Sequence, residues 1–249
     1  MTNIFNNRSE IILLVAFILV NILMYAFSYG DDAALRAGAD SGQYLRPARS
    51  LVDYGTFTMN PPGWTPEMSA SQPFTFGTPL YSILLALPYL LFAQTIKFYI
   101  TVIIIQCCLL YFIGWLSRHF LPFFNSRRSI LIHALVIFNP NSITTAHLIQ
   151  SETLFTLFVV TSLLFLFKYI KYGGITNLIF IGISAGLLTL TRPAGLYLVY
   201  MIPVIIITIK FFQFFQNKSI KKNYRQIFFS NFHFLIPVIV AFLVMSPWY

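Results

Sequence analysis

Long apolar runs alternate with short polar connectors along this chain, and the pattern predicts a bundle of membrane-spanning helices. The first run, residues 11–29, is close to the roughly 20 residues that a helix needs to cross a bilayer. It is longer than the apolar core of a signal peptide, usually about 7 to 15 residues, so we expect an uncleaved span. Further apolar runs cover residues 79–92, 98–116, 129–146, 153–167, 176–190, 195–215 and 227–245.

Two of these runs are predicted to differ from simple spans. A helix over residues 79–92 would rise only about 21 Å, which is less than the roughly 30 Å of a hydrocarbon core. We therefore expect an amphipathic, interfacial or partly inserted helix there. Residues 129–146 reach full length only by continuing through Asn139 and Pro140, so we expect a span with a proline kink. Seven spans result.

Composition agrees with this pattern. With 57% hydrophobic and 9% charged residues among 249, the chain has too few polar side chains to coat a water-soluble globule. The formal net charge of +9 could suggest a nucleic-acid partner, but the charges punctuate the apolar runs and form no single stripe. The sequence therefore predicts an all-α integral membrane protein that binds no nucleic acid, formed as one module over residues 1–249.

The basic residues also predict sidedness, because cytoplasmic connectors of membrane proteins are enriched in Lys and Arg. With Arg8 inside, three connectors fall on that side and the first loop lies outside. The basic residues of these connectors are Arg118, Arg127, Arg128, Lys168, Lys171, Lys218, Lys221, Lys222 and Arg225. A rival topology remains open, in which residues 79–92 span, the amino terminus is outside, and the first loop with its three arginines is cytoplasmic.

In the first topology most acidic residues gather on the outer face, together with His147 and Arg192. These acids are Asp31, Asp32, Asp40, Asp53, Glu67 and Glu152. Asp40 and Tyr44 share a spacing that places both on one face of a short helix in the first loop. Asp40 can instead be the cap of that helix, with Gln43 completing a capping box.

Two other segments bring polar groups to the same face. In "HLIQSETLF", Ser151 can cap the next helix and Glu152 lies in its first turn, where a carboxylate is favoured by the helix dipole. An ionised group at the mouth of a bundle is also a functional candidate. His147 and Glu152 could both reach a divalent ion, although such a pair lacks the spacing of a metal motif.

The segment "GISAGLLTLTRPAGL" supplies the third part of this face. Gly182 and Gly186 form a GxxxG pair that lets another helix approach closely. Arg192 follows at the end of this run, where it can either reach lipid headgroups or hold a phosphate with two hydrogen bonds.

Taken in order, these segments resemble polytopic glycosyltransferases of the GT-C type that use polyprenyl-phosphate sugars, such as protein O-mannosyltransferases and the bacterial lipid A aminoarabinose transferase. The segments are "ADSGQYLRPARSLVDYGTF", "GTPLYSILLALPYLLF", "NPNSITTAHLIQSETLF", "SAGLLTLTRPAG" and "SPWY". The chain departs from the family pattern at Ser41, where many relatives carry a second acid, and at Gly77 and Thr78, where some carry a charged pair. Relatives usually continue beyond "SPWY", so the resemblance implies a minimal module or one that lacks a carboxy-terminal half.

The resemblance implies a hexosyl- or pentosyltransferase of a bacterial cell membrane, with its active site at the outer face and Asp40 as the catalytic base. We expect Tyr44, Glu152, His147 and Arg192 to bind substrate, with Arg192 on the phosphate of the lipid donor. The expected partners are the polyprenyl-phosphate sugar, a glycan, lipid or protein acceptor, and membrane lipid. A transporter or flippase of lipid-linked sugars and an inactive scaffold subunit are the alternatives. Transport would need polar residues at mid-membrane, where Asn21, Gln106 and His133 are the candidates.

Overall fold

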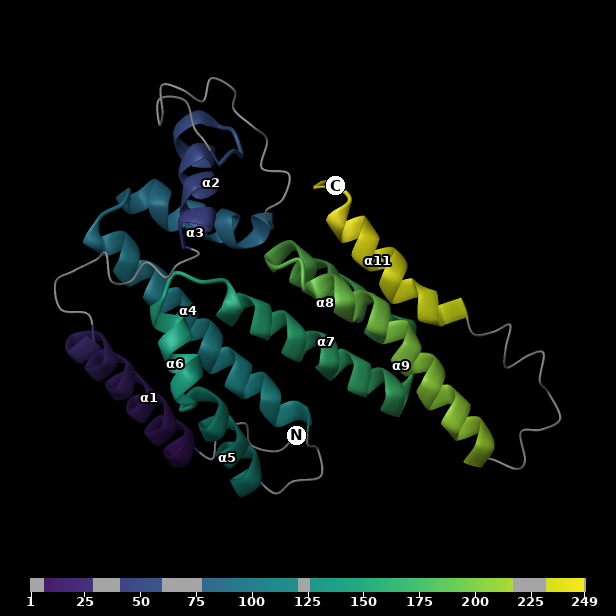
Figure 1. Ribbon diagram of the computed structural model, residues 1–249. Helices are drawn as coiled ribbons and strands as arrows, with labels where there is room; N and C mark the ends of the chain where they lie inside the picture. The colour runs from purple at the N-terminus through teal and green to yellow at the C-terminus, as the bar shows by residue number, and fades with distance from the viewer. Residues whose placement is uncertain (1–6, 29–40, 60–77, 121–125, 217–231, 249) are drawn as a thin grey trace. The chain divides into compact units, whose positions relative to one another are not determined.

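The protein is helical throughout the part of the chain that the computed structural model describes, residues 7–28, 41–59, 78–120, 126–216 and 232–248, and no strand occurs there (Figure 1). Within these described residues, four helices are long and apolar enough to cross a membrane: Arg8–Phe27, Ile96–Ser117, Glu152–Tyr172 and Gly195–Phe212. Three further apolar helices, Pro79–Phe92, Ile175–Thr191 and His233–Met245, are shorter. The structure thus confirms an all-helical chain with membrane-length helices, whereas the number seven remains a prediction.

The chain divides into two compact units, Met1–Leu157 and Phe158–Tyr249. In the first unit, α1 (Asn7–Ser28) and α4 (Ile96–Ser117) run antiparallel. Arg118, directly after α4, donates a hydrogen bond to the Glu10 carboxylate at 2.7 Å. Cys107, earlier in α4, donates to Asn21, later in α1. The start of α1 and the end of α4 therefore lie at the same face. The first topology requires this arrangement, whereas the rival topology would separate these ends.

The run over residues 129–146 is two helices and not one kinked span. α5 (Ser126–Ile137) ends before Asn139, and α6 (Pro140–His147) begins directly after it. The Asn139 side chain accepts hydrogen bonds from the backbone N–H groups of Asn141 and Ser142, at 3.0 and 3.3 Å. Pro140 occupies the first turn, where its missing N–H has no cost. The side-chain cap thus starts a new helix where we had expected the old one to continue.

The first loop carries α2 (Ser41–Tyr54), which packs against α3 (Pro79–Phe92). The predicted bounds of α3 are confirmed, with Pro79 at its amino-terminal end. Between them, residues 60–77 are not described. Pro47 is accommodated inside α2, and the buried face of this helix includes Tyr44 and Ala48. The loop helices thus present an aromatic face toward the interior of the first unit.

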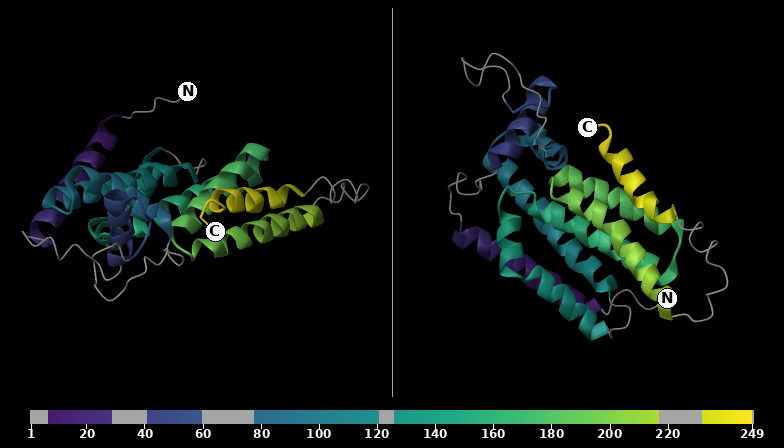
Figure 2. Two further views of the ribbon diagram at one scale, coloured as in Figure 1. Left: turned by 90° about the horizontal axis from the view of Figure 1, so that it is seen from above. Right: turned by 45° about the vertical axis from the view of Figure 1, so that its right-hand side comes forward.

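The second unit comprises the remainder of α7 (Glu152–Tyr172), α8 (Ile175–Thr191), α9 (Gly195–Gln216), η4 (Phe232–Leu235) and α11 (Ile236–Met245). Figure 2 shows yellow α11 alongside green α8 and α9. A Cβ atom at Gly182 would lie 2.6 Å from the Val240 Cβ, and one at Gly186 would lie 2.8 Å from the Val244 Cβ. The predicted close approach at this glycine pair is confirmed, and its partner is α11.

Candidate functional site

A polar cluster is buried in the first unit where α2, α3 and α4 meet the turn before α7. Tyr44 is 8% exposed, and its hydroxyl lies 2.9 Å from the Ser151 hydroxyl. The Tyr44 ring packs edge-on against Tyr81 of α3, with centroids 5.0 Å apart. Edge-to-face aromatic pairs add about 0.5–1.5 kcal/mol to the burial of the rings. The cluster therefore joins the first loop to the segment that precedes Glu152.

Tyr81 and Gln106 extend the cluster toward α4. Tyr81 is fully buried and donates a long hydrogen bond of 3.4 Å to the Gln106 side-chain oxygen. The Gln106 side-chain nitrogen donates in turn to the Leu148 carbonyl at 2.8 Å. Burial, and then the charge of Glu152 and the Tyr44 phenol, raise the pKa of Tyr81 well above its usual value. This phenol consequently stays protonated at neutral pH and acts as a donor.

Glu152 is the first residue of α7, as the sequence predicts, and its Oε2 atom is shielded from solvent. Ser151 precedes it at the start of the helix, where its carbonyl accepts the Phe155 N–H at 2.8 Å. Glu152 directly follows Ser151, which contacts Tyr44, and its charge contributes to the raised pKa of Tyr81. Of the predicted site residues, Tyr44 and Glu152 are thus brought together around Ser151 and Tyr81.

His147 lies at the end of α6 and is fully buried. Its Nδ1 atom lies 2.9 Å from the Ile143 carbonyl oxygen, and its Nε2 atom lies 3.3 Å from the Asn21 carbonyl oxygen. Both nitrogens face backbone acceptors, one in α6 and one in α1, and a neutral ring donates to α1 in the tautomer that carries its proton on Nε2. Whether His147 also contacts a substrate or an ion stays a prediction. In the described segments, no group of three or more His, Cys, Asp or Glu side chains is placed to hold a metal ion.

Arg192 belongs to the second unit and follows α8. Its backbone is extended, its N–H donates to the Leu188 carbonyl at 3.0 Å, and its own carbonyl accepts the Gly195 N–H at 2.9 Å. A Cβ atom at Gly195 would lie 2.6 Å from the Thr189 backbone nitrogen, so this tight turn into α9 requires glycine. The turn fixes where the arginine leaves the helix. Its predicted role on a phosphate stays a prediction.

Asp40, the predicted catalytic base, lies outside the described residues and immediately precedes α2 in the chain. Its neighbour Ser41 is buried at the start of that helix. The structure therefore fixes the position of α2 relative to Ser151 and Tyr81, and α2 directly follows Asp40 in the chain.

An apolar cavity of about 580 Å³ lies beside α1 and α4 in the first unit. Side chains such as Phe17, Ile18 and Ile103 line it, and Asn21, Cys107 and His147 supply its few polar atoms. Concave, mainly apolar sites with a few polar groups are typical of small-molecule binding. This cavity can therefore accommodate part of an apolar chain.

Sequence reasoning did not assign Tyr81 to the site, and it named Gln106 only as a polar residue at mid-membrane. A signal for Tyr81 was present, because Tyr81 and Ser82 interrupt an otherwise apolar helix. Gln106 is likewise a lone amide within α4, 1% exposed. Both residues owe their role to contacts with distant segments, which sequence spacing within one helix does not reveal.

Comparison of the chain with protein-family models, with curated proteins and with solved structures found no match.

Proposed function

We propose that this chain is a membrane glycosyltransferase that moves a sugar from a polyprenyl-phosphate donor to an acceptor hydroxyl or amine at the outer membrane face, with inversion. Asp40 acts as the general base, and Arg192 neutralises the leaving phosphate. Tyr44 and Glu152 orient the substrates. His147, at the end of α6 and before the turn that leads to Glu152, helps to position the acceptor. The proposal starts from the order of short segments that resemble the GT-C family.

The observation that carries the proposal is the 2.9 Å contact between the Tyr44 and Ser151 hydroxyls. It joins the helix that follows Asp40 to the residue that precedes Glu152, although 107 positions separate them in sequence. A transferase of this kind needs its loop acid and its bundle acid around one acceptor. The contact supports that requirement through buried, hydrogen-bonded groups, which hold side chains in fixed positions.

The chemistry assigned to these residues is a single displacement. The acceptor oxygen or nitrogen attacks the anomeric carbon while Asp40 takes its proton, and the bond from that carbon to the lipid phosphate oxygen breaks. The phosphate leaves with the electron pair, and Arg192 stabilises the added charge. General-base assistance contributes about 100- to 10,000-fold, and a preorganised cation acts more strongly in a poorly hydrated pocket than in water.

The apolar cavity beside α1 and α4 suits the donor's hydrocarbon chain. Within a bilayer the prenyl chain is already out of water, so its affinity for this cavity rests on van der Waals packing against the apolar walls. Such a substrate also accounts for an enzyme built within a bilayer.

The substitution Asp40→Asn tests the mechanism. We expect at least a 100-fold loss of transfer with donor binding retained, because the amide is nearly isosteric but cannot accept the proton. The measurement is release of free polyprenyl phosphate from a polyprenyl-phosphate sugar by the reconstituted protein. A transporter or a scaffold subunit would release none, even as the wild-type chain.

Asp53→Asn is the matched control. Asp53 lies on α2 and pairs with Arg49 at 3.1 Å and with the Tyr89 hydroxyl at 3.2 Å, on the exposed side of the loop helices. We expect this variant to keep its activity within about threefold, since exposed ion pairs contribute little. Equal rates for Asp40→Asn and the wild-type protein would remove the proposed mechanism.

A further inference from the structure

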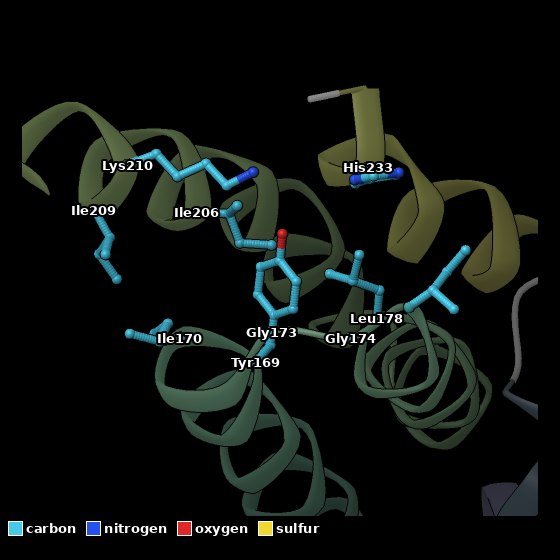
Figure 3. A pocket seen from close by; sticks show the side chains of 10 residues that line it. Tyr169, Ile170, Gly173, Gly174, Leu178, Ile206, Ile209, Lys210 and His233 are labelled. Atoms are coloured by element: carbon cyan, nitrogen blue, oxygen red, sulfur yellow. The ribbon is translucent and has the colours of Figure 1, made fainter. Parts of the chain in front are cut away.

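A second pocket, of about 420 Å³, lies in the second unit where α7 ends and α8 begins (Figure 3). α9 and η4 complete its walls. Its polar groups come from three elements: Tyr169 of α7, Lys210 of α9 and His233 of η4. Figure 3 shows the Lys210 ammonium and the Tyr169 hydroxyl pointing into the same space, with the His233 ring across from them. None of the proposed transferase residues lines this pocket.

Among the residues that line the pocket, Lys210 is charged and none is acidic. Residues 158–249 contain eight Lys and Arg residues and no Asp or Glu. The Lys210 ammonium lies 5.9 Å from the centre of the Tyr169 ring, a cation–π contact that holds it at the pocket. Its long stem is half-buried, so the charge is fixed on the lining and does not extend freely into water. A pocket of this charge favours an anion.

The turn between α7 and α8 contributes backbone to the same wall. Gly173 and Gly174 have φ values of +71° and +92°, which favour glycine. The Asn177 side chain donates to the Gly173 carbonyl at 2.6 Å and fixes this turn at the start of α8. The amino-terminal end of a helix carries a partial positive charge, so it adds to the attraction for an anion.

The remaining walls are apolar and include Ile170, Leu178, Ile206 and Ile209. Two membrane-length helices, α7 and α9, end close to the pocket: the apolar segments finish at Tyr172 and Phe212. The end of a span lies at the depth of the lipid headgroups. An anionic group at this depth that is joined to hydrocarbon fits both the basic residues and the isoleucine walls, whereas a free ion fits only the basic residues.

We propose that this pocket binds the phosphate of an anionic phospholipid, with Lys210 as its principal cation. Tyr169 donates its hydroxyl to a phosphate oxygen, His233 supplies a ring N–H from η4, and the acyl chains lie against the apolar walls. Basic pockets between membrane helices bind headgroups in this way. The site is separate from the proposed transfer chemistry and would hold whether or not the chain transfers sugar.

The test measures binding of dioctanoyl phosphatidylglycerol to the full-length protein in neutral detergent by native mass spectrometry. We expect Lys210→Gln to weaken binding about fivefold, the factor for losing one basic residue near an anionic lipid. Lys210→Arg keeps the charge and should restore binding to within about twofold. Circular dichroism and the unfolding midpoint establish that each variant is folded.

Lys171→Gln is the matched control, because it removes one positive charge at the end of α7 that borders the pocket, from a side chain that is exposed and does not line the pocket. It should leave binding within about twofold of wild type, because an exposed charge that does not contact the ligand is screened by water and salt. Equal weakening by Lys210→Gln and Lys171→Gln, or no weakening by either, would overturn the proposal. So would equal binding of dioctanoyl phosphatidylcholine. Displacement of the lipid by millimolar inorganic phosphate would also overturn the proposal, because it would show that the pocket binds free phosphate.

Discussion

The polar cluster of the first unit and the contact between α8 and α11 in the second unit are different kinds of contact. In the first, polar side chains hold segments together across long sequence distances, as in the contacts of Tyr44 with Ser151 and of Gln106 with Leu148. In the second, α8 lies against α11 through Gly182 and Gly186, and the contact is backbone against side chain. Buried polar groups are costly unless they are paired, whereas small residues allow close packing at no such cost.

This difference separates the parts that these units play. The polar cluster fixes the position of particular side chains, which is the requirement of a binding or reacting site. The glycine contact fixes the distance between two helices and specifies no chemistry. We therefore expect these two contacts to respond to substitution in opposite ways: the α8–α11 contact should be sensitive to added volume, and the polar cluster should be sensitive to lost hydrogen bonds.

The largest effect should come from Gly182→Ala. The added Cβ would lie 2.6 Å from the Val240 Cβ and 2.7 Å from the Pro237 carbonyl oxygen, so α8 and α11 must separate. Overpacking of this kind costs typically about 1–3 kcal/mol, and we expect a value near the upper end because one neighbour is backbone. The measurement is the free energy of unfolding in mixed micelles on titration with sodium dodecyl sulfate.

Gly42→Ala provides the matched control in the first unit. Apart from its chain neighbours and the backbone of its own helix, nothing lies within 4 Å of a Cβ built at Gly42 in α2. Alanine is favoured over glycine inside a helix by up to about 1 kcal/mol, so this variant should be as stable as the wild-type protein or slightly more stable. Equal losses at the two glycines would mean that α11 does not restrict volume at Gly182.

Gln106→Leu should have the second largest effect. Leucine keeps most of the volume but removes the Gln106 oxygen that accepts from the buried Tyr81 hydroxyl. It also removes one of two donors to the Leu148 carbonyl, which keeps the Gln150 N–H at 2.9 Å. An unpaired buried group costs about 1–3 kcal/mol, and we expect a loss of about 2 kcal/mol in the same unfolding measurement.

Thr101→Val serves as the control for Gln106→Leu, because Thr101 lies on the same helix and bonds only to the Lys97 carbonyl one turn earlier. This control should stay within about 0.5 kcal/mol of the wild-type protein, as surface changes usually do. A Gln106→Leu variant as stable as the wild-type protein would show that the polar contacts of α4 do not hold the first unit together.

Much of the fold could be predicted because it depends on local sequence. The lengths of α1, α4, α7 and α9 follow from runs of apolar residues, and Pro79 marks the start of α3. The break between α5 and α6 was not predicted. Asn139 precedes a proline, and this sequence is compatible with either a kinked helix or the cap of a new helix. The outcome depends on the hydrogen-bond partners of the Asn139 side chain, which here accepts from the backbone of α6.

The candidate site was less predictable because its contacts are long-range. The spacing in α2 places Tyr44 on the buried face, yet its partner Ser151 was expected only to cap α7. Likewise, the Gly182 and Gly186 pair indicates a close helix but not that α11 fills the position. Local periodicity identifies which face of a helix is buried, whereas the identity of the partner depends on how the whole chain packs.

The smallest effect should come from Ser162→Ala in the second unit. This variant measures how much one hydrogen bond between helices contributes to the free energy of unfolding where small residues pack the helices. The Ser162 hydroxyl donates to the Ser184 hydroxyl at 2.8 Å and joins α7 to α8. Ser184 also donates within its own helix, to the Phe180 carbonyl at 2.7 Å, so it keeps a partner when Ser162 is lost. We expect a loss of about 0.6 kcal/mol, the average for hydrogen bonds between membrane helices. A loss as large as that of Gln106→Leu would contradict the contrast between the units, because it would make polar contacts equally important in both.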